Sequence, residues 1–188
     1  AISLASGRAN PISLGNRNAN PIGMENMTIS VGDTLPQATL LQLGNEGPEA
    51  VELGPKLAGR KVVLFGLPGA FSGTCSTAHV PSFIRTKGDF DAKGVDEIIC
   101  VSVNDPFVMQ AWGEATGATE AGLTFLGDAD GSFTKAIGMD FDAPPAGLHG
   151  RSKRYAMLVE DGVVKVLNEE ASPGTCEISS GETLLDAL

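Results

Sequence analysis

The chain passes from a predicted strand through a small polar loop into a predicted helix in residues 61–83, KVVLFGLPGAFSGTCSTAHVPSF. Residues 61–67 form an apolar run that is β-branched in part and ends at a Pro-Gly pair, which is typical of a strand covered on both faces. Residues 75–93 follow as a helix with apolar side chains along one face. A cysteine, Cys75, therefore lies where a glycine-containing loop becomes a helix.

The rest of the sequence alternates between strand and helix patterns in the same way. Asn104-Asp105-Pro106 suits the start of a helix, and Asp161-Gly162 is the two-residue turn of an antiparallel hairpin. The order predicts an α/β fold with a mixed central sheet flanked by helices, in which chemistry gathers at the carboxyl ends of the strands. The predicted strands are 38–43, 61–67, 96–103 and 123–128 with the hairpin 154–170, and the predicted helices are 52–61 (or a turn), 75–93, 104–115, 131–139 and 179–188.

The composition predicts one globular domain that does not depend on disulfide bonds. The 188 residues are 42% hydrophobic, which is enough to bury a core in one domain, residues 30–188. A formal charge of -10 repels phosphate backbones and anionic lipid, so we expect neither nucleic acid nor a membrane as partner. The three cysteines are too few and too far apart for a secreted disulfide scaffold and favour a reducing compartment.

Residues 1–29 differ in composition from the rest and are predicted to be a disordered extension. Residues 1–24 contain no acidic residue, but they hold two arginines, three serines and the near-repeat ANPI. Proline and asparagine at these positions oppose both helix and strand. This composition fits a tail without function, an expression tag or the remnant of an organelle transit peptide. We therefore expect the cytoplasm or, for a transit-peptide remnant, a plastid or mitochondrion.

The surroundings of Cys75 favour a reactive thiol. The thiolate is the nucleophilic form of cysteine, and the N–H groups at the start of a helix stabilise it. Gly73 lets the backbone approach closely, while Ser72 and Thr74 offer hydroxyl groups. The alternative is an inert cysteine packed at a strand–helix junction, as most free cysteines are. His79 shares a helical face with Cys75 but has no second pair of ligands nearby, so we expect it to orient the site rather than bind a metal.

The segment PGAFSGTCSTAHVPSF, residues 68–83, resembles the active-site signature of the peroxiredoxins, in which a proline, a threonine or serine and a cysteine have the spacing of Pro68, Ser72 and Cys75. Its longer form is similar to the type II, peroxiredoxin-5-like subfamily, and above all to the plant and algal enzymes. The likeness covers residues 30–188. It implies a thioredoxin-like fold, an antioxidant thiol peroxidase that reduces hydrogen peroxide and alkyl hydroperoxides, and no cofactor or metal.

In that family a hydroxyl, an arginine and backbone amides hold the peroxide while the thiolate attacks it. The resemblance implies Cys75 as the peroxidatic nucleophile and Arg154 as the group that stabilises the thiolate and the charge developing as the O–O bond breaks. Ser72 replaces the usual threonine and lacks the methyl group that stiffens the rotamer. Pro68 has no N–H and shields the thiol from water. Around the substrate we expect Gly73, Thr74 and His79.

The sulfenic acid formed on Cys75 must be resolved by another thiol, and the sequence leaves three sources open. Cys100 lies in a predicted buried strand, at the place where plant and algal type II enzymes carry a cysteine. Cys176 lies in a Pro-Gly turn and matches the resolving position of mammalian peroxiredoxin-5. We favour Cys176, because bringing Cys100 within about 7 Å of Cys75 would need local unfolding. The third source is an external thiol such as thioredoxin, glutaredoxin or glutathione.

Two other functions compete with a peroxidase. A disulfide carrier of the same fold normally has a C-x-x-C pair, whereas Ala78 stands three residues after Cys75. A structural thioredoxin-like domain would have no need for Ser72, Cys75 and Arg154 together. The resemblance also implies a homodimer formed through loops around the active site, where Phe71 offers an apolar contact.

Overall fold

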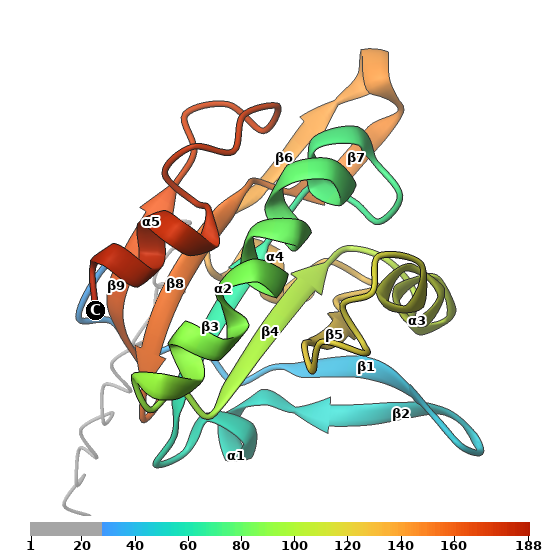
Figure 1. Cartoon of the computed structure of the whole chain (residues 1–188). Helices are drawn as coiled ribbons and strands as arrows, with labels where there is room; N and C mark the ends of the chain where they lie inside the picture. Colours follow the sequence, from blue (N-terminus) through green and yellow to red (C-terminus); the bar gives the residue numbers. More distant parts are fainter. Residues whose placement is uncertain (1–27) are drawn as a thin grey trace, which may run out of the picture.

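The computed structural model describes residues 28–188, which form a seven-stranded mixed sheet, a separate two-stranded sheet and the helices around them (Figure 1). The large sheet has the strand order β2-β1-β5-β4-β3-β8-β9, and β6 pairs with β7. The strands are β1 (Thr39–Gly44), β2 (Gly47–Glu52), β3 (Lys61–Gly66), β4 (Glu97–Ser102), β5 (Thr124–Gly127), β6 (Asp140–Ala143), β7 (Leu148–Ser152), β8 (Tyr155–Glu160) and β9 (Val163–Glu169). The helices are α1 (Leu53–Leu57), the π-helix η1 (Cys75–His79), α2 (Val80–Ala92), α3 (Pro106–Ala115), α4 (Ser132–Ala136), the 3-10 helix η2 (Pro144–Ala146) and α5 (Gly181–Asp186).

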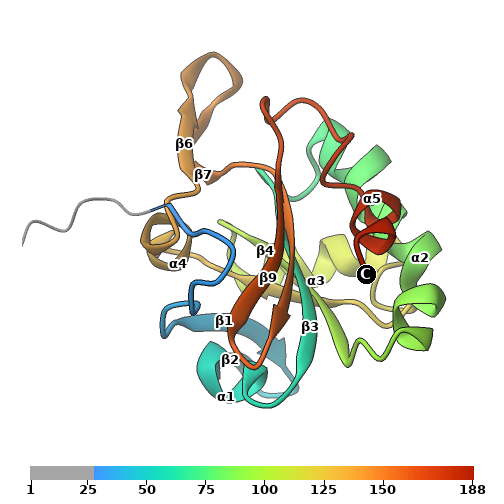
Figure 2. The same cartoon turned by 90° about the vertical axis from the view of Figure 1, so that its left-hand side faces the viewer.

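The apolar strand β3 lies inside the large sheet, parallel to β4 and antiparallel to β8. Its alternate side chains enter two hydrophobic cores, Val62 and Leu64 on one side and Val63 and Phe65 on the other. Helices α2, α3 and α5 cover the second core, whereas α1 and α4 cover the first (Figure 2). The α/β fold with a mixed central sheet, predicted from the alternation of patterns, is therefore confirmed.

The predicted helix 75–93 is divided into two parts. In η1 the turn is wider than in an α-helix, since the N–H of Val80 donates to Cys75 O, five residues back. The regular helix α2 begins directly afterwards, with Pro81 in its first turn. A proline inside a continuous helix removes one backbone hydrogen bond, and here it directly follows the wide turn of η1.

Three strands were not predicted. β2 forms a hairpin with β1, and β6 and β7 form the two-stranded sheet, which projects from the upper end of the molecule in both views (Figures 1 and 2). Their side chains are mostly half-buried or exposed, so none of the three contains the continuous apolar run that identifies a buried strand. The remaining predicted elements are present within a few residues of their expected bounds.

The predicted extension, residues 1–29, lies outside the described residues except for its end. Ile29 is buried in the first core and donates its N–H to Ile137 O at 2.9 Å, so the packed domain includes it. Among residues 28–188, no helix has the length and apolar character needed to cross a membrane.

Candidate active site

Cys75 lies just beyond the carboxyl end of β3, at the first residue of η1, and only 1% of its surface is exposed. The loop before it includes Phe71, whose φ of 59° is unusual for a residue other than glycine. The N–H of Ala70 donates to Oδ1 of Asn104 at 3.0 Å, which ties this loop to the chain after β4. The predicted position of Cys75, at the junction of a strand and a helix, is thus what the structure has.

Arg154 immediately precedes β8 and reaches the sulfur of Cys75 across the end of the sheet. Its Nη2 donates to Cys75 Sγ at 3.2 Å and to Pro173 O at 2.9 Å, and its Nε donates to the same carbonyl at 3.2 Å. The side chain is 1% exposed, so this fork of donors is held without water. Gly66, the register partner of Tyr155, leaves room for the Tyr155 ring, because a Cβ there would collide with it.

His79 lies behind Arg154 rather than beside the substrate cavity, where it was expected. Its Nδ1 is 3.1 Å from Nη1 of Arg154 and its Nε2 is 3.0 Å from Ser179 O. Because a carbonyl can only accept and a guanidinium can only donate, Nε2 carries the proton and Nδ1 accepts. Burial, together with the charge of Arg154, lowers the pKa of His79 to about 3, so the ring is neutral. The neutral ring therefore accepts from Arg154 and lies behind the guanidinium.

A cavity of about 340 Å³ opens beside Cys75 and Arg154. Of the residues expected around the substrate, Pro68, Ser72, Gly73 and Thr74 line it. Ser72 donates its hydroxyl to Gly69 O at 2.6 Å, so its oxygen keeps a lone pair for a ligand. The opposite wall is apolar and comes from β6, η2 and β7. It consists of Phe141, Ala143, Ala146 and Leu148.

Sequence reasoning missed that wall and the acceptors that hold Arg154 and His79. The acceptors are backbone carbonyls of Pro173 and Ser179, and a carbonyl has no residue-type signal because every residue carries one. Phe141 and Ala143 have the alternating spacing of a strand, but two apolar residues are too short a run to identify one. They are recognised as part of the site only because the folded chain places residues 140–152 and the loop before Cys75 around the same cavity.

The other two thiols differ in accessibility. Cys100 is fully buried in β4, where burial and the nearby Cys75 raise its pKa well above the usual value, although Arg154 acts in the opposite direction. Cys176 is half-buried in the loop between β9 and α5, and burial raises its pKa as well. All three cysteines are free thiols.

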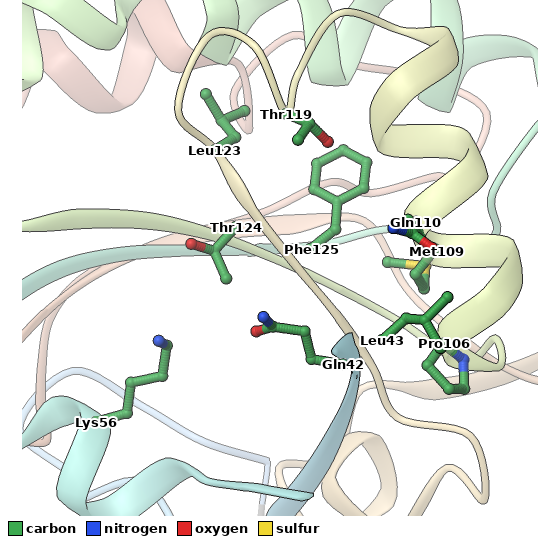
Figure 3. A pocket seen from close by; sticks show the side chains of 10 residues that line it. All are labelled: Gln42, Leu43, Lys56, Pro106, Met109, Gln110, Thr119, Leu123, Thr124 and Phe125. Atoms are coloured by element: carbon green, nitrogen blue, oxygen red, sulfur yellow. The ribbon is translucent and has the colours of Figure 1, made fainter. Parts of the chain in front are cut away.

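A second cavity, of about 330 Å³, lies between β1, β5 and α3 (Figure 3). It contains no cysteine, and Lys56, the one charged residue that lines it, is paired with Glu97 at 3.0 Å. Within residues 28–188, no group of three His, Cys, Asp or Glu side chains is arranged to hold a metal ion. The cavity at Cys75 is therefore the one that combines a nucleophile, a cation and space for a small molecule. Its chemistry suits a thiolate that attacks an electrophile whose developing negative charge lies near Arg154.

Comparison with known proteins finds similar chains over most of the described residues. A profile of the Redoxin family matches residues 30–185. The chloroplastic peroxiredoxin-2E-2 of Oryza sativa subsp. japonica is 50% identical over 165 residues, 86% of this chain and 73% of that protein. Reduced Prx3 from Vibrio vulnificus, solved in complex with hydrogen peroxide, is 51% identical, with a TM-score of 0.79 over 85% of this chain and 99% of that one. Peroxiredoxin 5 from Alvinella pompejana is 30% identical, with a TM-score of 0.74 over 85% and 97% of the two chains.

Proposed function

Since this chain belongs to the type II peroxiredoxins of the redoxin family and is a thiol peroxidase with a thioredoxin-like fold, we propose that Cys75 is its peroxidatic nucleophile. The observation that carries the proposal is the 3.2 Å contact between Arg154 Nη2 and Cys75 Sγ next to a cavity. A guanidinium that donates to the sulfur places a fixed positive charge where negative charge develops in the reaction.

The proposed reaction uses groups that already surround the sulfur. The thiolate of Cys75 forms a bond to one peroxide oxygen, the O–O bond breaks, and the leaving alkoxide or hydroxide takes a proton to give an alcohol or water. Arg154 stabilises the charge on the leaving oxygen, and the Ser72 hydroxyl positions the substrate. The apolar wall of the cavity supports alkyl hydroperoxides as substrates besides hydrogen peroxide.

We propose that Cys176, rather than Cys100, resolves the sulfenic acid. Condensation of the sulfenic acid with the second thiol forms an S–S bond and releases water. Cys100 is in register with Phe65 on one side and Phe125 on the other, so its movement would break two strand ladders. Cys176 lies outside the strands, and no ladder holds it. The disulfide would then be reduced by thioredoxin, glutaredoxin or glutathione.

Mass spectrometry tests these assignments together. The reduced protein is treated with one equivalent of hydrogen peroxide, alkylated and digested. We expect a peptide in which Cys75 is linked to Cys176, with Cys100 alkylated. A Cys75–Cys100 peptide would reverse the choice of resolving thiol, and Cys75 oxidised without any internal link would assign resolution to an external thiol. Oxidation confined to Cys100 and Cys176 would overturn the peroxidatic role of Cys75.

A homodimer is proposed through the loops around the site. Phe71 is 59% exposed beside the reactive loop, and Phe107, at the start of α3, is equally exposed. Asn104 connects the two segments through its bond to Ala70. Two apolar side chains on neighbouring segments would be covered in a dimer. Sedimentation that shows only monomer at tens of micromolar, roughly where weak specific interfaces assemble, would count against it.

An organelle is the proposed location. Residues 1–24 are free of acidic side chains and contain arginine and serine, and the rice relative carries the word chloroplastic in its name. Fractionation of cells that produce the protein tests this. Recovery in the cytosolic fraction alone would contradict it.

A further inference from the structure

The buried carboxylate of Glu170 takes no part in the proposed reaction, yet the loop beside the active site is folded around it. Glu170 follows β9 directly, and its N–H donates to Arg154 O at 3.0 Å, so the two residues are neighbours across the strand pair. The residue is only 8% exposed, although it lines a cavity with Phe141, Lys153 and Ile178. A carboxylate in such a place is stable only if it is hydrogen-bonded.

Three short hydrogen bonds hold this carboxylate, and all come from one segment, the loop 171–180. Its Oε1 accepts from the N–H of Glu177 at 2.6 Å, from the N–H of Ser179 at 2.9 Å and from the Ser179 hydroxyl at 2.8 Å. Its Oε2 is 3.3 Å from the hydroxyl of Thr175, whose nearer acceptor is Ser172 O at 3.0 Å. Burial acts to raise the pKa of Glu170, but these hydrogen bonds outweigh it and the pKa lies below the ordinary value. The carboxylate of Glu170 is therefore an anion to which several groups of the loop 171–180 are hydrogen-bonded.

The same loop supplies the two carbonyls that fix the active-site cation. Pro173 O accepts from Nε and Nη2 of Arg154, and Ser179 O accepts from Nε2 of His79, whose other ring nitrogen accepts from Nη1 of Arg154. Three of the nitrogen atoms of Arg154 are thus aimed by groups that depend on the loop. The second N–H of Nη2 donates to Cys75 Sγ.

We propose that Glu170 is a positioning residue for peroxide reduction, which holds the loop 171–180 so that Pro173 O and Ser179 O aim Arg154 at the sulfur of Cys75. The proposal rests on the role assigned to Arg154 in the proposed function. Glu170 itself touches neither the sulfur nor the cavity beside it, so it acts only through the geometry of Arg154. A small displacement of a catalytic group is costly, because the transition state needs its partners in place.

The test is a double-mutant cycle on the first oxidation step. Trp112, the only tryptophan of the chain, donates its Nε1–H to Ser76 Oγ at 3.0 Å, so its fluorescence reports on the residue after Cys75. The rate constant for reaction of the reduced protein with hydrogen peroxide is measured by stopped flow for the wild type, Glu170→Gln, Arg154→Gln and the double variant. Glu169→Gln is the matched control, because Glu169 is the adjacent carboxylate but pairs with Lys153. Thermal melting confirms that each variant is folded.

We expect Glu170→Gln to react about fivefold more slowly, since a neutral amide makes weaker bonds than an anion with the same donors. In the Arg154→Gln background the same change should have no further effect, because residues that act as a unit are not additive. Glu169→Gln should react like the wild type. A wild-type rate for Glu170→Gln, or an equal loss in both backgrounds, would overturn the inference while leaving the role of Arg154 intact. A wild-type rate for Arg154→Gln would overturn the proposed role of Arg154 and the inference with it.

Discussion

Cys75 and Cys100 are two buried thiols in the same hydrophobic core, but their surroundings differ. Cys75 begins a helix, lines a cavity and accepts a hydrogen bond from Arg154. Cys100 lies in the middle of a strand that is paired on both edges, and its pKa is raised well above the usual value, chiefly by burial. Burial alone therefore does not distinguish a reactive thiol from an inert one. The difference lies in a cation that contacts the sulfur and in a space from which a substrate can approach it.

The most direct test of this difference between the two thiols is to replace each cysteine with serine. We expect Cys75→Ser to reduce peroxide consumption to the rate of the uncatalysed reaction, because an alcohol is not ionised at neutral pH. Cys100→Ser should leave the oxidation step within about twofold of the wild type, since packing changes of this size in a core cost stability more than chemistry. Peroxide consumption with dithiothreitol as reductant measures both. Comparable activity in the two variants would contradict the distinction.

The Arg154→Lys variant separates the effect of the positive charge from the effect of the planar guanidinium group. Lysine keeps the charge, but it has no planar fork to bond the sulfur and the Pro173 carbonyl at once. We expect the oxidation rate constant to fall roughly a hundredfold, the scale found when an oriented donor is lost from an active site. Competition with a heme peroxidase for hydrogen peroxide provides the measurement. If the lysine variant reacted at the wild-type rate, charge alone would be sufficient.

Because His79 is buried and neutral, the free energy of unfolding should depend on pH. Its pKa is about 3 in the folded protein and 6.5 in the reference state, so below pH 6.5 the unfolded chain binds a proton that the folded one does not. The contribution of His79 to the free energy of unfolding is complete above pH 6.5. It decreases by about 1.4 kcal/mol per pH unit as the pH falls from 6.5 toward 3. His79→Asn should flatten this part of the stability profile, whereas replacement of the exposed His149 should not. Urea unfolding over this pH range checks both; equal slopes in wild type and His79→Asn would be the contrary result.

The smallest expected effect concerns the hydroxyl beside the thiol. Ser72→Thr adds the methyl group that restricts the side-chain rotamer. The oxidation rate constant should rise by up to about threefold, because less than 1 kcal/mol of rotamer freedom is at stake. Ser72→Ala, the companion variant, should react more slowly than the wild type. Stopped-flow oxidation that ranks alanine equal to serine would show that the hydroxyl is not used.

The sequence predicted the position of Cys75 better than it predicted Arg154 and the groups that hold Arg154 in place. The strand β3, the loop and the position of Cys75 follow from local patterns of apolar residues, glycine and the helix start. Arg154, by contrast, was identified only through the family resemblance, since a lone arginine beside Lys153 is most simply a surface charge.

The carbonyls of Pro173 and Ser179 and the apolar wall could not be predicted. They come from residues far apart in the sequence that meet only in the folded chain. The wide turn of η1 is equally hidden, because one additional residue in a helical turn leaves no trace in composition.

The two-stranded sheet β6–β7 has a practical consequence for protein engineering. It shares no strand with the seven-stranded sheet, yet it provides the apolar side of the cavity opposite the sulfur. The strands that shape this side of the cavity are therefore not part of the sheet whose strand ends hold Cys75 and Arg154, although β7 ends two residues before Arg154. Side chains at positions such as 141 and 148 can be diversified in a library without altering a single ladder of the large sheet. The fold thus offers a modular surface on which new substrate preferences can be selected while the reactive machinery stays constant.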